Sequence, residues 1–405
     1  MTTNKKKELK QLKVFERNIQ RPFFIPRFLK IIIYYITCMP KNELDSLKDI
    51  FKSVDALNPD AEILEASTLS SADDWIDTGS YALNAIISGS MYKGIPSGRI
   101  TGFAGPSMAG KTLIMNKIMA NAQKKGYIPV IWDSEVAVDK KSAENVGMDT
   151  SKVKYYPVET IEDCRNQMCA FLDNVIKARE SNPDLKFIAT IDSLGNLASA
   201  KEIKDAAAGK EAADVGQRAK AIKSMMRVLT YKAAKAKVPI LFSNHVYEGM
   251  EMFPTLVKNQ SGGKGPIYLA SVLVQLSTRN EKTADNPEEQ SVAIAHNISG
   301  VTLGALTVKN RFVPNYLKTE LYLNFKSGLS KHAGLFEIAE AFKVIEKPGR
   351  TVMYKGESLG YRKDLEKSPE FWEKIMPDLE IALQENLCYG KSSTSEIEEE
   401  IDNIE

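Results

Sequence analysis

Residues Gly105-Pro106-Ser107-Met108-Ala109-Gly110-Lys111-Thr112 decide the fold, because they follow the G-x-x-x-x-G-K-[ST] pattern of a phosphate-binding loop. Upstream, residues 99–104 read as a short apolar strand, and downstream, residues 113–123 carry apolar residues at helical spacing. The motif requires this strand-to-helix context, since its backbone N–H groups close round a β-phosphate at the start of a helix. A chance glycine-rich turn is the alternative. The matching context favours a nucleoside triphosphate site.

Two side chains of this loop have predicted roles in binding. We expect Lys111 to reach the β- and γ-phosphate oxygens of ATP and the Thr112 hydroxyl to hold Mg²⁺. Gly105 and Gly110 allow the backbone to close round the phosphates.

The rest of the chain alternates between short apolar runs and stretches with apolar residues at helical spacing. The runs lie at residues 127–132, 154–158, 187–191 and 238–243, and the predicted helices at 140–147, 161–180 and 217–236. This alternation predicts an α/β fold with a mainly parallel twisted sheet and helices on both faces. Later strands at 273–278, 301–309 and 319–326 have no helices between them, which predicts hairpin-connected additions to the sheet.

We predict five segments. They are a basic N-terminal extension (1–42), an oligomerisation segment (43–75), the ATPase core (76–330), a small C-terminal α+β domain (331–390) and an acidic tail (391–405). The oligomerisation segment has one apolar helix stripe, made of Leu44, Leu47, Ile50, Phe51 and Val54, which must bury itself against its own domain or a neighbouring subunit. The basic extension holds nine Lys or Arg against two Glu up to residue 38. It is either a basic arm for a membrane surface or a non-native extension before a working start at Met39, and we assign it no function.

Composition excludes several classes of protein. The 43% hydrophobic and 26% charged content is that of an ordinary globular protein. The four cysteines form no C-x-x-C pair and have no histidine at ligand spacing, so a zinc site or disulfide framework is not expected. A reducing, cytoplasmic location is expected, which would be the host cytoplasm for a viral protein.

Polar residues at the ends of apolar strands predict the catalytic chemistry, since ligands of such sheets bind at the carboxyl ends of the strands. Asp192 ends one run, and its carboxylate suits the Mg²⁺ shell opposite Thr112, with a turn cap as the alternative. Glu135 follows another strand and could orient and deprotonate an attacking water. His245 ends a third strand, where it could sense the γ-phosphate or simply hydrogen-bond at the strand terminus. Together these residues predict ATP hydrolysis by in-line water attack.

Two long stretches follow strand ends, at residues 200–216 and 246–265, and we expect both to be functional loops. After the first, the basic residues Lys220, Lys223 and Arg227 share one face of the predicted helix. The second holds Tyr247, Phe253, Lys258 and Lys264 around Gly262-Gly263. Basic residues with interleaved aromatics suit single-stranded nucleic acid. A solvated basic helix face is the alternative.

Taken together, the motifs resemble the RecA-type recombinases, and among these most closely a bacteriophage member. The resemblance extends over residues 43–350 and rests on Ile76-Asp-Thr-Gly-Ser80, Gly98-Arg-Ile100, the phosphate loop, Asp133-Ser-Glu135, Ile191-Asp-Ser-Leu-Gly-Asn-Leu197, Ser243-Asn-His245 and Gly262-Gly-Lys-Gly-Pro266.

The resemblance implies roles for residues of the nucleotide site. Glu135 matches a catalytic glutamate, Asp192 an Mg²⁺-linked aspartate, and His245 a γ-phosphate sensor. Asp139 matches an adenine-contacting aspartate, but Ser142 stands where the family stacks a tyrosine on the base.

Further matches concern assembly and DNA. Lys309 and Arg311 match two lysines that reach the ATP of a neighbouring subunit, and Tyr268 matches an interface aromatic. Residues 203–216 and 247–265 match the two DNA-binding loops, with Gly216, Lys220, Lys223, Arg227, Phe253, Gly262, Gly263 and Lys264 on or beside DNA contacts. The acidic tail resembles tails that modulate DNA access.

The resulting prediction is an ATP- and Mg²⁺-dependent recombinase that forms a helical filament on single-stranded DNA and exchanges strands with a homologous duplex. A recombination mediator and a single-strand-binding protein are expected as partners, and a membrane is not. The alternatives are a hexameric helicase with the same core, a nucleotide-binding mediator without strand exchange, and a metabolite kinase.

Overall fold

The computed structural model describes residues 50–64, 67–69, 71–210, 216–247, 257–279, 300–324 and 328–388. It divides into two units, residues 1–67 and 68–405, which we describe separately. In the first unit, residues 50–55 are helical, and the helix predicted from residue 44 is described only in this part. Its apolar side chains Ile50, Phe51 and Val54 are all exposed.

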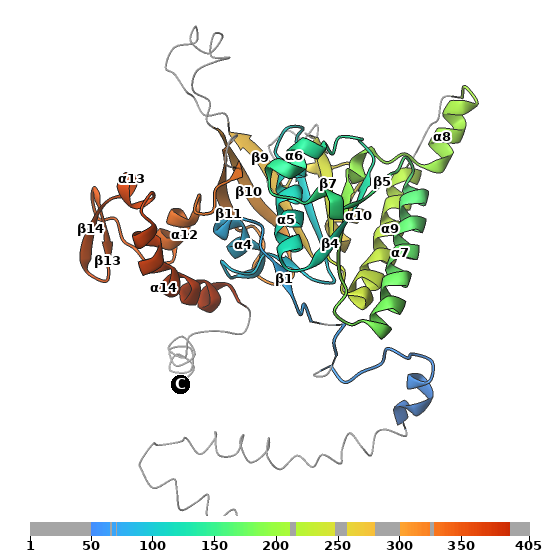
Figure 1. The fold of residues 1–405 in the computed structure, drawn as a ribbon, viewed down its shortest axis with the longest axis horizontal. Coiled ribbons are helices and arrows are strands. Elements are labelled where there is room, and N and C mark those ends of the chain that lie inside the picture. Colours follow the sequence, from blue (N-terminus) through green and yellow to red (C-terminus); the bar gives the residue numbers. More distant parts are fainter. Residues whose placement is uncertain are drawn as a thin grey trace, which may run out of the picture. The chain divides into compact units, whose positions relative to one another are not determined.

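The second unit is built on a ten-stranded sheet with the order β12-β11-β10-β9-β3-β7-β6-β4-β5 and with β8 paired to β7 (Figure 1). The strands are β3 (Ile100–Gly105), β4 (Tyr127–Asp133), β5 (Lys154–Pro157), β6 (Lys186–Asp192), β7 (Ile240–Tyr247), β8 (Asn259–Gln260), β9 (Val272–Arg279), β10 (Gly300–Asn310), β11 (Lys318–Asn324) and β12 (Gly328–Leu329). Strands β5, β4, β6, β7, β3 and β9 pair in parallel, while β10, β11 and β12 are added antiparallel. The predicted α/β class with a mainly parallel sheet is confirmed.

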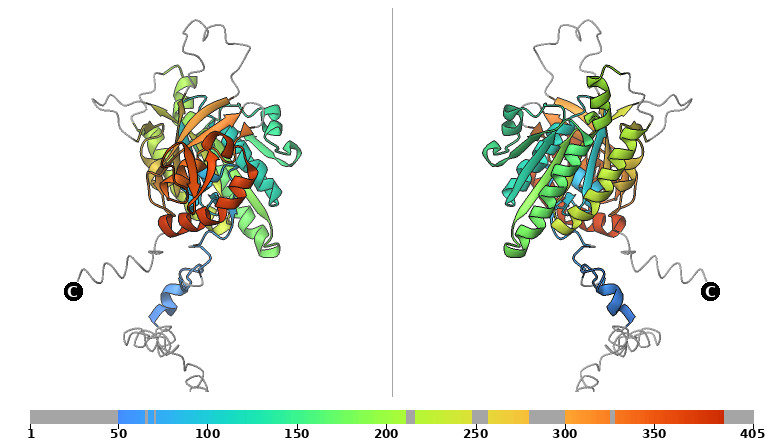
Figure 2. Two further views of the ribbon diagram at one scale, coloured as in Figure 1. Left: turned by 90° about the vertical axis from the view of Figure 1, so that its left-hand side faces the viewer. Right: turned by 90° about the vertical axis from the view of Figure 1, so that its right-hand side faces the viewer.

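The two faces of the sheet bury separate apolar cores, because successive side chains of a strand point to opposite faces. Phe103 and Ile131 contribute to the core under helices α4 (Tyr81–Ser88), α5 (Lys111–Lys124) and α6 (Lys140–Asn145). Their neighbours Ala104 and Trp132 contribute to the other core, under α7 (Ile161–Ser181), α9 (Gln217–Ala236) and α10 (Gly265–Leu269). Figure 2 shows α7 and α9 side by side along that second face.

A third core joins the C-terminal elements to α4. These elements are α12 (Leu335–Ala341), β13 (Thr351–Tyr354), β14 (Glu357–Tyr361), α13 (Arg362–Leu365) and α14 (Pro369–Leu387). Trp372 and Leu379 of α14 pack in one cluster with Ala82 and Ala85 of α4. Helix α4 therefore contributes to two cores, since Leu83 lies in the core of the main sheet. The domain boundaries given above stay a prediction.

One expectation about local structure is wrong. Residues 200–207 of the first predicted loop form helix α8 (Ala200–Ala207), and residues 211–215 lie outside the described part. A capping box explains the helix, because the Ser199 side chain accepts from the Glu202 N–H while the Glu202 carboxylate accepts from the Ser199 N–H.

The remaining elements of the unit are strands β1 (Trp75–Ile76) and β2 (Ile95–Pro96) and the 3₁₀ turns η1 (Thr150–Lys152) and η2 (Leu194–Asn196). Among the described residues, no helix is both long enough and apolar enough to cross a membrane.

Candidate nucleotide and DNA site

The phosphate loop connects the end of β3 to the start of α5, as the motif requires. Gly110 has a φ of 73° and Met108 a φ of 62°, so two residues of the loop adopt the left-handed region. The Met108 side chain is almost fully exposed. The Lys111 ammonium donates to the carbonyl oxygens of Gly105 and Pro106 at 3.0 and 2.8 Å, so the lysine folds back over its own loop. The ammonium group therefore lies against the loop that is expected to bind the phosphates.

Asp192 lies at the carboxyl end of β6, beside the first turn of α5. The Thr112 hydroxyl donates to Asp192 Oδ2 at 2.7 Å, and the Ser243 hydroxyl donates to Oδ1. Burial raises the pKa of Asp192 above its ordinary value, and the two hydroxyl donors only partly offset this effect. A carboxylate and a hydroxyl oxygen therefore stand side by side at the phosphate loop, which is the oxygen-rich donor set that Mg²⁺ prefers.

Glu135 follows the end of β4 and meets residues from two other strands. The Ser193 hydroxyl donates to Glu135 Oε1 at 2.5 Å, and His245 Nε2 lies 2.9 Å from the same oxygen. Burial acts to raise the pKa of Glu135, but these hydrogen bonds outweigh it and the pKa is lowered. The structure thus brings four predicted residues together at the carboxyl ends of the parallel strands: Glu135, Asp192, His245 and Lys111.

Lys309 and Arg311 lie toward the amino ends of the parallel strands, whereas the phosphate loop lies at their carboxyl ends. The Arg311 N–H donates to the Ser271 carbonyl, and the Ser271 N–H donates to the carbonyl of Ile100, the first residue of β3. Because the phosphate loop follows the last residue of β3, about 17 Å of strand separates Arg311 from the loop. Lys309 lies level with Gly102 of β3, about 10 Å along the sheet from Gly105, and its ammonium donates to the Tyr268 carbonyl. Neither side chain is long enough to reach the loop of its own chain.

The basic helix that follows the first predicted DNA-binding loop lies against the glycine-rich part of the second loop. Lys220, Lys223 and Arg227 are exposed along α9, which begins after Gly216 at a φ of 77°. A side chain on Gly262 would come within 2.6 Å of Ile222, and one on Gly265 within 3.2 Å of Lys223. Gly263 and Lys264 are therefore held at the start of α9, where both are exposed. Phe253 lies outside the described residues.

Comparison with known proteins identifies the family. The RecA N-terminal domain matches residues 48–330. The "Recombination and repair protein" of Enterobacteria phage T4 is 30% identical over 70% of this chain and 68% of that protein. "Protein RecA" of Bifidobacterium breve is 28% identical over 74% of this chain and 71% of its own length, and that of Thermus aquaticus is 26% identical over 83% and 94%.

The chain belongs to the RecA family. It is a RecA-family homologous recombination and repair protein and a DNA-dependent ATPase. Membership of the RecA family implies that it binds ATP and DNA and forms filaments.

Within this RecA-family site, Asp139 has a local structural contact. Its side chain caps α6 by accepting from the Ser142 N–H at 2.9 Å. The cap also fixes where Ser142 lies, at the first turn of the same helix.

Two residues of the RecA-family site were missed from the sequence, Asp133 and Ser193. The fully buried Asp133 accepts from the N–H groups of Glu135, Val136 and Val138, which shapes the turn that carries Glu135. Asp133 and Asp192 are register partners on the neighbouring strands β4 and β6, and each is followed by a serine. This repeated Asp-Ser pair at two strand ends was the available signal. Ser134 and Ser193 hydrogen-bond to each other across it, at 2.7 and 3.0 Å.

Proposed function

We propose that the chain is an ATP-dependent recombinase that assembles as a helical filament on single-stranded DNA and exchanges strands with a homologous duplex. The observation that carries this proposal is the position of Lys309 and Arg311 at the sheet edge far from the phosphate loop of their own chain. Stacking of two copies head to tail would present this edge of one copy to the phosphate loop of the next.

In the proposed reaction, Lys111 and the loop N–H groups bind the β- and γ-phosphates of ATP. Thr112 and Asp192 would hold Mg²⁺, which neutralises charge on the phosphate oxygens when it is bound. Glu135 orients the attacking water and accepts its proton, since a carboxyl group with a lowered pKa is ionised near neutral pH, as a proton acceptor must be, and its hydrogen bonds to Ser193 and His245 hold it in place. His245 bridges Glu135 to the DNA face, since its backbone carbonyl accepts from the N–H of Ser261, next to Gly262.

Completion of the site between copies explains why ATP favours assembly. Lys309 and Arg311 of one copy would contact the γ-phosphate held by its neighbour, so the interface is strongest while the triphosphate is intact. Lys309 has no carboxylate partner among the described residues; its ammonium donates to the Tyr268 carbonyl. Hydrolysis then removes the phosphate and weakens the interface and the hold on DNA.

Single-stranded DNA is proposed to bind along the start of α9 and the glycine-rich segment beside it. The basic residues there suit the phosphate backbone, and sequence is read by base pairing between strands.

The exposed apolar residues at 50–54 support residues 43–75 as the oligomerisation segment. Asp139 is proposed to contact adenine. A mediator, a single-strand-binding protein and the acidic tail are proposed to control access to DNA.

A hexameric helicase is the main rival, because it shares the core and also completes its sites between subunits. Electron microscopy with ATP and single-stranded DNA separates the two, since the recombinase should give open helical filaments and the helicase closed rings. A nucleotide-binding mediator is a second rival. It would leave the rate of strand exchange between homologous DNAs at background.

A mixing experiment tests the proposed site between copies. Lys111→Ala removes the lysine of the phosphate loop but keeps Lys309 and Arg311. The double variant Lys309→Ala, Arg311→Ala keeps the phosphate loop but lacks the two residues proposed to reach the neighbouring copy. Each alone should hydrolyse ATP at background rate. In an equal mixture, about one interface in four pairs an intact loop with an intact far edge, so about a quarter of the parental rate should return. A mixture that stays inactive would remove Lys309 and Arg311 from the neighbouring site.

A further inference from the structure

The η2 turn lies between the two proposed DNA segments and the turn that carries Glu135. Its Gly195 carbonyl accepts from two sides: from the Arg218 guanidinium on α9, and from the Ser261 hydroxyl in the glycine-rich segment, at 3.3 Å. Arg218 also donates to the Leu197 carbonyl, at 2.8 Å. Both DNA segments therefore hold one short turn, and Arg218 makes two of these hydrogen bonds.

Close packing leaves this turn little room to move. A side chain on Gly195 would come within 2.7 Å of Asn244 Oδ1 and 3.2 Å of Ser261 Cβ. Leu194 and Leu197, on either side of Gly195, are fully buried. An interior packed this closely transmits a displacement to its neighbours. A shift of η2 must therefore reach the residues that are bonded to it.

The other side of η2 is bonded to the turn that carries Glu135. The Asn196 amide donates to the Ser134 carbonyl at 2.7 Å, and the Asn196 N–H donates to the Ser193 carbonyl at 3.2 Å. Ser193 directly precedes η2, and its hydroxyl donates to Glu135 Oε1 at 2.5 Å. The position of η2 thus decides whether the Ser193 hydroxyl reaches the carboxylate that is proposed to accept the proton of water.

Arg218 and Lys220 lie on different sides of α9. They are two residues apart, which is about 200° around the helix axis, so a strand that contacts Lys220 lies away from η2. The helix begins after Gly216, which has no side chain to cap the first N–H groups. A DNA phosphate can bind to such groups. Bound DNA would therefore fix the first turn of α9 from its outer side.

We propose that Arg218 is a positioning residue that couples single-stranded DNA to ATP hydrolysis. DNA that fixes the first turn of α9 would hold the guanidinium on the Gly195 and Leu197 carbonyls, so that η2 keeps Ser193 on Glu135. Without DNA, a displacement of that turn by about 1 Å would break a hydrogen bond of 2.8 Å. This inference rests on the proposed path of DNA along α9 and on the proposed role of Glu135.

This connection is separate from the one through His245. The His245 ring contacts Glu135 directly, and its backbone carbonyl accepts from the N–H of Ser261. Arg218 acts from α9, through η2 and Ser193. Each DNA segment therefore has its own connection to Glu135, and loss of one should reduce the stimulation by DNA without abolishing it.

ATP turnover of the full-length chain with and without single-stranded DNA tests the proposal. Arg218→Met keeps the length of the side chain and removes its donors. At saturating DNA its kcat should be about tenfold below that of the parent, with KM for ATP and the low turnover without DNA unchanged. Arg218→Lys can donate to one carbonyl at a time, so its kcat should lie between the two. A parental kcat in Arg218→Met would overturn the proposal.

A salt series separates this role from direct contact with DNA. Lys220→Met loses a proposed phosphate contact, so the slope of log affinity against log salt concentration should fall by about 0.7. Arg218→Met should keep the parental slope. A slope that falls as it does in Lys220→Met would mean that Arg218 binds DNA itself, and would overturn the proposal.

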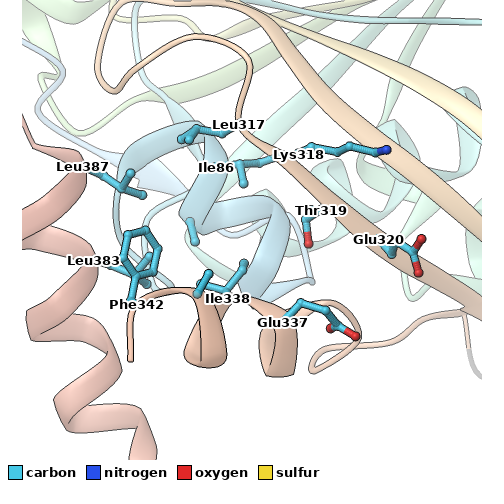
Figure 3. A pocket seen from close by; sticks show the side chains of 12 residues that line it. Ile86, Leu317, Lys318, Thr319, Glu320, Glu337, Ile338, Phe342, Leu383 and Leu387 are labelled. Carbon is cyan, nitrogen blue, oxygen red and sulfur yellow. The ribbon is translucent and has the colours of Figure 1, made fainter. Parts of the chain in front are cut away.

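The matched control comes from the C-terminal elements. Their apolar groove, between α4, β11, α12 and α14, is lined by none of the residues that connect α9 to Glu135 (Figure 3). Arg350 precedes β13 and is exposed, so Arg350→Met loses an arginine at the surface. It should keep the parental kcat and the parental slope.

Two further measurements test the step through Ser193. The acid limb of the pH profile should move to higher pH in Arg218→Met, because Glu135 loses a hydrogen bond that helps to lower its pKa. Asn196→Ala should lower kcat in the same way, and the double variant with Arg218→Met should be no slower than the slower single variant, since both act through η2. An unmoved acid limb, or effects that multiply, would overturn the proposal. A parent that DNA does not stimulate would instead contradict the proposed function, and the inference with it.

Discussion

At the scale of single residues, Ser193 shows how a neighbouring side chain can set the acidity of Glu135, the proposed proton acceptor. Its hydroxyl donates to Glu135, and that hydrogen bond helps to lower the pKa of the glutamate. Ser193→Ala should raise this pKa and free the carboxylate to rotate. We expect kcat for DNA-stimulated ATP hydrolysis to fall about threefold to tenfold, with ATP affinity unchanged.

The pH profile separates this effect from a structural one. Glu135 must be ionised to accept a proton, so the acid limb of the profile should move to higher pH in Ser193→Ala. A lower kcat with an unmoved acid limb would mean that Ser193 acts only on the fold.

Lys309 provides a second prediction at this scale. Burial, and then the charge of Arg311, lower the pKa of Lys309 to about 8. A lysine is charged below its pKa, so raising the pH from about 7 to about 9 removes the charge offered to the neighbouring phosphate. Assembly on labelled single-stranded DNA with ATP, followed by anisotropy, should weaken several-fold over this range. Lys309→Arg stays charged and should flatten the profile, whereas parallel profiles would contradict the role of the ammonium.

At the scale of elements, one ionic network joins the amino-terminal ends of two strands, on the side of the sheet opposite the phosphate loop. Asp74 accepts from Lys125, from the Tyr127 hydroxyl at 2.9 Å and from Lys186 at 3.1 Å. It thereby joins the segment before β1 to the starts of β4 and β6. Burial opposes ionisation of Asp74, but these donors outweigh it and lower its pKa to about 2.

This network predicts a dependence of stability on acid. A carboxyl group with a lowered folded pKa stabilises the fold above its unfolded pKa of about 4, and the stabilisation is lost as the pH falls through about 2. Because the carboxylate is partly open to water, we expect Asp74→Asn to lower the free energy of unfolding at neutral pH by about 1 kcal/mol. Urea unfolding at several pH values measures this.

An exposed aspartate is the control for Asp74. Asp149 pairs with Lys152 and also has a pKa of about 2, but its carboxylate lies on the surface and, among the described residues, bonds only to Ser151 and Lys152 of its own turn. Asp149→Asn should cost less than Asp74→Asn. Equal effects would mean that the network contributes only local charge pairing.

The elements also show what the sequence could predict. The strands and long helices follow from apolar periodicity. Glu135, Asp192 and His245 could be placed because they lie at or near the carboxyl ends of parallel strands, although β7 continues two residues beyond His245. Helix α8 was missed because Ile203 is the single large apolar residue in it and no stripe results, although its capping box was readable. Asp133 and Ser193 act across neighbouring strands, so only the Asp-Ser pair repeated at two strand ends pointed to them, and their hydrogen bonds could not be read from local spacing.

At the scale of the whole molecule, net charge is only +2, so overall charge cannot explain binding to a polyanion. In our proposal the basic residues on α9 bind DNA locally, and each contact with a DNA phosphate releases counterions. ATP turnover should therefore be stimulated by single-stranded DNA and fall as salt rises. Turnover that needs no DNA, or only duplex DNA, would contradict this.

The salt dependence of DNA affinity reports how many DNA phosphates the protein contacts. The logarithm of the affinity for single-stranded DNA should fall linearly with the logarithm of salt concentration, and Lys223→Ala should reduce the slope by about 0.7. Lys177→Ala is the matched control, since Lys177 is an exposed lysine on α7, away from the glycine-rich segment that packs at Lys223. Its slope should equal that of the parent. Equal slopes for all three proteins would mean that DNA does not follow the start of α9, and the path of the strand would have to lie elsewhere on the filament.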